Sequence, residues 1–120
     1  GNVRIIRLTE VKFIKWEAMA KSGQGAAALA ELNAFSAERG GKSYTGDALT
    51  AILAEKRIEF IGEGLRFFDL KRNNLPIVKT TNVRGGVYNV PTDSKLFVFP
   101  IPSSSLNLNK LITQYPGWGN

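Results

Sequence analysis

Apolar and polar residues follow helical periods in the first 72 positions and lose that regularity afterwards. Apolar residues recur at three- and four-residue spacings through residues 3–22, 26–39 and 47–72, which predicts three helices. Glycine and serine at 22–25 and two glycines at 40–41 lie between them and are typical of helix ends. The pattern predicts a mainly α fold, in which a helical hairpin of tetratricopeptide-like kind is followed by a long helix.

The first predicted helix is apolar on nearly all of its sides. One side carries Leu8, Trp16 and Met19. Another side carries Val11, Ile14 and Ala18. A helix of this kind is normally covered on several sides, and the two other helices can cover two of its three. We therefore expect this chain alone to expose an apolar patch that includes Leu8, Trp16 and Met19. Further protein or a second copy would normally bury that patch.

The chain after residue 72 has a different composition. Asn73, Asn74 and Pro76 end the helical region. Residues 76–93 are rich in valine, threonine, asparagine and glycine, which predicts an extended loop with a short hairpin around residues 84–86. The apolar run 95–101 is strand-like and ends at prolines. We therefore expect a helical part, 1–72, and a part made of extended loops and a docking tail, 73–120.

The third predicted helix carries acids on its apolar side. Glu55, Glu59 and Glu63 are spaced four residues apart and form one column on that side. A buried carboxylate is costly without a partner, and Arg66, Asp69 and Arg72 follow on the same side of the helix. The pattern favours a buried or half-buried ion network formed by Glu55, Glu59, Glu63, Arg66, Asp69 and Arg72. A solvated charged helix and a catalytic carboxylate pair are the alternatives, the latter without any nearby nucleophile.

Gly62 and Gly64 lie on either side of Glu63. Each glycine disfavours a helix interior by about 1 kcal/mol relative to alanine. They indicate either a helix break with a restart near Leu65 or a close approach by another segment.

Composition narrows the chemistry. The chain has neither cysteine nor histidine, which excludes disulfides, thiol and imidazole catalysis and the usual zinc sites. We therefore expect no metal and no cofactor. The formal net charge of +6 could indicate a nucleic-acid partner, but the bases are scattered among acids and form no basic block. The sequence contains no transmembrane run and no signal peptide.

The charged stretch resembles the signature of the SusD/RagB family, nutrient-binding lipoproteins on the outer membrane of Bacteroidetes. The matching residues are Glu55, Lys56, Arg57, Glu59, Glu63, Gly64, Arg66, Asp69, Leu70 and Arg72. Arg7, Glu10, Glu17 and Ala18 match a helix that precedes the signature in this family, and residues 99–102 match its F-P-I-P element. Residues 107–118 resemble its closing segment, although Lys110, Tyr115 and Trp118 replace a proline, an asparagine and a tyrosine.

The resemblance implies that residues 1–120 are one segment, the C-terminal part of a larger protein whose N-terminal part is missing here. It implies a non-catalytic protein without cofactor that binds glycan or oligosaccharide. Such a protein lies at the cell surface, on the outer membrane, and delivers its ligand to a SusC-like TonB-dependent transporter. The lipid anchor would lie outside this segment, and the segment itself would be mostly scaffold.

Tyr115 and Trp118 are the candidate ligand-binding residues, because aromatic rings bind the apolar faces of sugars. The pattern favours a second role, in which the two rings attach the tail to the helices, since large aromatic side chains more often bury area. Two other functions stay open. The first is a free-standing helical protein-interaction module that binds a peptide in a groove. The second, nucleic-acid binding, is suggested by charge alone, and we expect no nucleic-acid partner.

Overall fold

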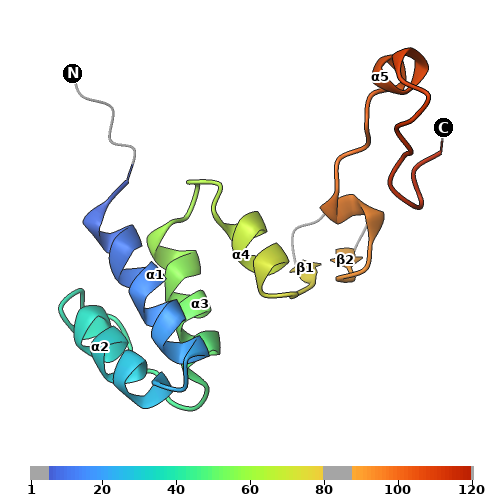
Figure 1. Cartoon of the computed structure of the whole chain (residues 1–120). Coiled ribbons are helices and arrows are strands. Elements are labelled where there is room, and N and C mark those ends of the chain that lie inside the picture. The colour runs from blue at the N-terminus through green and yellow to red at the C-terminus, as the bar shows by residue number, and fades with distance from the viewer. Residues whose placement is uncertain (1–5, 80–87, 120) are drawn as a thin grey trace, which may run out of the picture. The chain divides into compact units, whose positions relative to one another are not determined.

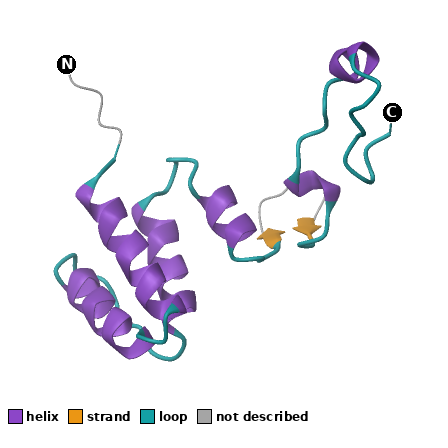
Figure 2. Cartoon of the chain, viewed as in Figure 1, coloured by secondary structure: helices purple, strands orange, loops and turns teal. Residues whose placement is uncertain are grey.

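The structure is a computed structural model that describes residues 6–79 and 88–119. The chain divides after Gly64 into two compact units, each of which is described by itself. The described residues form five α-helices, two short strands and one 3-10 helix (Figures 1 and 2). The expected mainly α fold is confirmed.

The first unit is a bundle of three helices that all contact one another (Figure 1). The helices are α1 (Leu8–Lys21), α2 (Gly25–Ala37) and α3 (Ala48–Glu59). Only three residues separate α1 from α2, so the two form the predicted hairpin. Asp47 caps α3 by accepting a hydrogen bond from the Thr50 amide at 2.7 Å. Hydrogen bonds from Thr50 also hold the pKa of Asp47 below its usual value.

Aromatic rings fill the centre of this bundle. Phe13 packs edge-on against Trp16, Phe35 and Phe60, with ring centroids 5.1–5.5 Å apart. Leu32 and Ile52 are fully buried beside them. These side chains come from all three helices and the residue that ends α3, so their burial supplies most of the driving force that holds the helices together.

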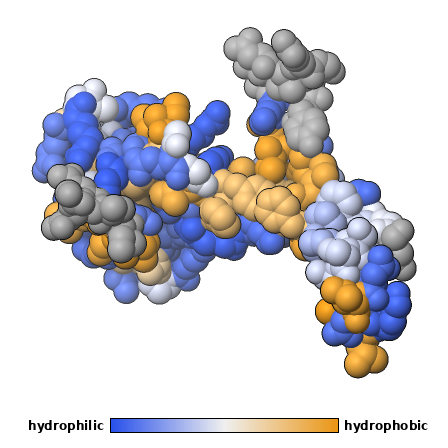
Figure 3. Space-filling view, turned by 90° about the horizontal axis from the view of Figure 1, so that it is seen from above, coloured by the Kyte–Doolittle hydropathy of each residue, from blue (hydrophilic) through white to orange (hydrophobic). Residues whose placement is uncertain are grey.

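One side of α1 is left uncovered. Leu8 is 74%, Val11 49% and Ile14 55% exposed, and Ala18 is also exposed. Figure 3 shows apolar residues among hydrophilic ones on the surface. The expectation of an exposed apolar patch therefore holds for Leu8, while Met19 is half-buried. It is wrong for Trp16, because this indole turns inward and joins the aromatic core.

The second unit contains short elements. They are α4 (Arg66–Arg72), β1 (Ile77–Lys79), β2 (Tyr88–Val90), the 3-10 helix η1 (Lys95–Phe97) and α5 (Ser103–Leu108). The strands β1 and β2 pair antiparallel, with Ile77 opposite Val90. The predicted hairpin turn at residues 84–86 lies outside the described residues. Leu70, Val90 and Phe97 are buried, and the Phe67 and Phe97 rings stack at 5.7 Å.

Three details differ from the sequence-based expectation. The single long helix over residues 47–72 is wrong, since α3 ends at Glu59 and α4 begins at Arg66. Gly62 and Gly64 lie between them at φ +81° and +76°, a conformation that glycine adopts without strain, so the break with a restart near Leu65 is confirmed. The run 95–101 is not a strand but begins with η1, and α5 forms in the serine-rich stretch that was expected to be loop.

Candidate functional site

Two acids of the signature, Glu59 at the end of α3 and Glu63 in the turn that follows it, meet a base at the start of α1. Arg7, at the start of α1, places Nη2 at 2.8 Å from Oε1 of Glu63 and Nη1 at 3.6 Å from Oε1 of Glu59. Arg39 approaches the other carboxylate oxygen of Glu59 at 3.6 Å. The Glu59 side chain is only 17% exposed, so its charge is compensated from two sides where water is partly excluded.

Phe60 adds a ring to this group of charges. The Arg7 guanidinium lies 4.6 Å from the centre of the Phe60 ring, and the Arg39 guanidinium lies 3.6 Å from the centre of the Phe35 ring. Both arginines therefore combine an ion pair with a cation–π contact. The arrangement fastens the end of α3 to the start of α1 and the end of α2.

Glu55 has a different partner from the other acids. Its Oε2 accepts a hydrogen bond from the Tyr44 hydroxyl at 2.6 Å, and both side chains are buried. Burial, together with the hydrogen bond to Glu55, raises the pKa of Tyr44 to about 12. The hydroxyl thus stays protonated, and the bond attaches the loop before α3 to the middle of that helix.

The rest of the signature lies in the second unit. Asp69 is buried and pairs with Arg72 Nη1 at 2.6 Å, and Lys71 Nζ donates to the Phe97 carbonyl at 2.8 Å. Arg66 is half-buried, and it also has an interaction. Its expected contact with Glu59, Glu63 or Asp69 stays a prediction. So does the single network that would join all six predicted residues.

Sequence reasoning found the acids but missed most of their partners. The partner of Glu63 is Arg7, that of Glu59 is Arg39, and that of Glu55 is Tyr44. None of these three partners was expected from the sequence. Arg7 was noticed only as part of the family resemblance. An arginine directly before a helix that is apolar on most sides is the one signal in the sequence that could have indicated it.

The tail is fastened by side chains near its end. Gln114 accepts from the Ile101 amide at 3.0 Å and donates to the Ile101 carbonyl at 2.9 Å, as a neighbouring strand would. Trp118 Nε1 donates to the Val98 carbonyl at 2.9 Å. Lys95 Nζ lies 4.6 Å from the centre of the Trp118 ring and donates to the Gly117 carbonyl at 2.7 Å. Trp118 thus ties the end of the tail to residues 95–98 of the same unit, and its expected attachment of the tail to the helices stays a prediction.

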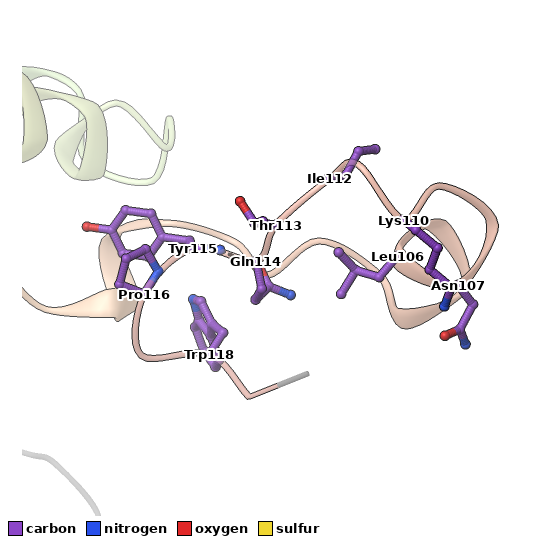
Figure 4. Close-up of a pocket in the computed structure, with 9 residues that line it drawn as sticks. All are labelled: Leu106, Asn107, Lys110, Ile112, Thr113, Gln114, Tyr115, Pro116 and Trp118. Carbon is purple, nitrogen blue, oxygen red and sulfur yellow. Dashed lines mark hydrogen bonds between the residues drawn. The ribbon is translucent and has the colours of Figure 1, made fainter.

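A pocket of about 500 Å³ lies on the tail itself (Figure 4). Its lining includes both candidate ligand-binding residues, Tyr115 and Trp118. Figure 4 shows Tyr115, Pro116 and Trp118 towards one end and Leu106, Asn107 and Lys110 towards the other. Tyr115 is 41% exposed, so its ring is accessible from solvent. The pocket therefore has an aromatic end and a polar end.

Two classes of feature are missing from the part of the chain that the structure describes. No three histidine, aspartate, glutamate or cysteine side chains there come together in a way that could hold a metal ion. None of the helices within residues 6–79 and 88–119 has the length and hydrophobicity needed to cross a membrane.

Comparison with known proteins identifies the family. No curated protein sequence matches the chain. Among solved structures, a protein from Bacteroides vulgatus described as a candidate sugar-binding protein is 26% identical in sequence and superimposes with a TM-score of 0.75. The match covers 96% of this chain, and the chain spans 28% of the length of that protein. The model of the SusD family matches residues 1–118, and the chain therefore belongs to the SusD family.

Proposed function

We propose that the chain is the C-terminal part of a longer, non-catalytic protein that binds glycan at the bacterial cell surface. The longer protein lies on the outer membrane, held by a lipid anchor outside this segment. It passes its ligand to a SusC-like TonB-dependent transporter. The segment described here is mostly scaffold and contributes few contacts to the ligand.

The observation that carries this proposal is the family match over residues 1–118, which includes the dense signature between Glu55 and Arg72. The candidate sugar-binding relative supports a glycan as the ligand. The scaffold role is supported by the use of the signature side chains. Glu55, Glu59 and Asp69 are engaged by partners inside the chain, so these acids are not free to bind ligand.

The test uses native gels that contain one polysaccharide each, run with the chain and with the longer protein encoded by its gene. We expect at least one polysaccharide to retard the longer protein, and the chain to be retarded less. Incubation with that polysaccharide should release no new reducing ends, since the protein is not an enzyme. Retardation by none of a broad panel, or release of reducing ends, would contradict the proposal.

The alternative function, a free-standing helical interaction module, is favoured by the exposed row of Leu8, Val11 and Ile14 on α1. It predicts that the chain forms a stable complex with a peptide and that glycan has no effect on mobility. The gel experiment therefore separates the two functions.

A further inference from the structure

The pocket on the tail is lined by one basic residue and no acid, a charge pattern that is not needed to attach the tail. Its nine lining residues are Leu106, Asn107, Lys110, Ile112, Thr113, Gln114, Tyr115, Pro116 and Trp118. Lys110 is the only charged residue among them, and no acid lines the pocket. A ligand that carries a negative charge is therefore favoured over a positively charged one.

The polar end of the pocket has unused hydrogen-bonding groups. Among the described residues, neither the Asn107 amide nor the Lys110 ammonium has a partner within the chain, and both side chains are exposed. Gln114, by contrast, is engaged with the Ile101 backbone and the Tyr115 amide and acts as part of the wall. An ammonium and an amide together donate hydrogen bonds to a carboxylate and to hydroxyl groups.

One ring of the aromatic end, the Trp118 indole, is held in place before any ligand arrives. The hydrogen bond from Trp118 to the Val98 carbonyl and the contact of Lys95 with its ring fix the indole. Tyr115 is tied at its backbone, where its amide donates to Gln114 Oε1 at 3.0 Å. A fixed ring loses little side-chain freedom on binding, and the C–H face of a pyranose packs on such a ring.

We propose that this pocket binds a short acidic oligosaccharide, with a sugar ring against Tyr115 and Trp118 and a hexuronate carboxylate at Lys110. The volume of about 500 Å³ lies within the range of small-molecule sites, and the two ends of the pocket suit a ligand whose apolar face and charge are on different units. The inference rests on the proposed function. It assigns one class of ligand, acidic oligosaccharides, to one pocket of a segment that is mostly scaffold.

The experiment compares trigalacturonate with galactotriose, which has the same number of rings and no carboxylate. Emission from Trp118 reports binding to the full chain, because Trp16, the other tryptophan, is 3% exposed in the core of the first unit. Calorimetry gives the affinity. We expect trigalacturonate to bind about 2- to 5-fold more tightly, the effect of one exposed charge pair, and this preference to shrink at high salt.

Three variants assign the preference to the pocket. Lys110→Gln should remove the preference and leave galactotriose binding unchanged. Tyr115→Ala should weaken both ligands, because it removes a ring and no charge. Lys79→Gln is the matched control, since Lys79 is an exposed lysine of the same unit that does not line the pocket. Far-UV circular dichroism of each variant shows whether the chain stays folded.

Several outcomes would overturn the inference. They are equal affinity for the two trisaccharides, an unchanged preference in Lys110→Gln, and Trp118 emission that does not respond to either ligand. If the longer protein is still retarded by a polysaccharide, only the pocket assignment fails. If neither the chain nor the longer protein binds any glycan, the proposed function fails with it.

Discussion

Arg7 gives the sharpest test of how the signature stabilises the first unit. Its guanidinium contacts Glu59, Glu63 and the Phe60 ring, so Arg7→Ala removes two ion pairs and one cation–π contact. An exposed ion pair contributes about 0–1 kcal/mol, and a cation–π contact at a similar site about 0.5–1 kcal/mol. Truncation of one member of a buried pair costs about 3–5 kcal/mol.

The surroundings of Arg7 lie between those limits. Its side chain is 36% exposed, Glu63 is 45% and Glu59 is 17% exposed. Arg7 Nε is buried without a hydrogen bond, which offsets part of the gain. Glu59 also keeps Arg39 as a partner after the substitution. We therefore expect Arg7→Ala to lower the free energy of unfolding of the first unit by about 1–2 kcal/mol.

Urea unfolding followed by the emission of Trp16, in a Trp118→Phe background, measures this loss. With a slope near 1 kcal/mol per M for so small a unit, the midpoint should fall by about 1–2 M. Arg57→Ala is the matched control, because Arg57 is exposed on α3 and contacts none of these acids, and its effect should stay within about 0.5 kcal/mol. If the two variants unfold at the same urea concentration, the ion pairs of Arg7 do not stabilise the bundle and the reasoning is refuted.

Three further predictions concern the same unit and its end. Because burial and Glu55 raise the folded-state pKa of Tyr44 to about 12, above the usual value of 10.0, the folded protein holds this proton more tightly than the unfolded chain. The stability of the chain should therefore fall as the pH rises from about 10 to about 12, and urea midpoints should show a smaller fall in Tyr44→Phe. Leu32→Ala, at a fully buried position, should cost about 2–5 kcal/mol in the same melts, and a loss below 1 kcal/mol would contradict the described core. An alanine Cβ at Gly62 or Gly64 would meet no atom within 4 Å, but alanine would have to adopt a positive φ there. Gly62→Ala and Gly64→Ala should therefore each lower the free energy of unfolding by about 1 kcal/mol. A stabilisation in either variant would indicate that the helix continues through this break.

Periodicity in the sequence was enough to place the three helices of the first unit, apart from the end of the third, and to predict that Glu55 and Glu59 lie on the buried side of that helix. It did not identify Arg7 as the partner of Glu59, because 52 residues separate the two and only tertiary packing brings them together. Helical spacing predicts partners only three or four residues apart on one helix. Asp69 and Arg72, which are three residues apart within α4, are such a pair.

Short elements escaped prediction for a related reason. α5 has six residues and η1 has three. Both elements are too short for a periodic pattern of apolar residues to repeat. The side chain of Ser94 starts η1 by accepting from the Leu96 amide at 3.2 Å, and Pro102 precedes the first residue of α5. Both are local signals that apply equally to turns, so the sequence could not separate a turn from one turn of helix.

The contacts of the signature bear on where recognition can occur. Glu55, Glu59 and Asp69 are the signature acids that lie at buried or half-buried positions, and each is held by a side chain of the same unit. A side chain already engaged in a half-buried pair would have to break that pair before it could bind a ligand, at a cost of the same order as the pair itself. The surfaces that carry unengaged groups lie elsewhere, in the apolar row of Leu8 and Ile14 on α1 and in the pocket of the tail. The chemistry of these two surfaces differs, since the first suits another protein surface and the second a small polar ligand. Experiments on partners should therefore change α1 and the tail separately, and leave the signature intact.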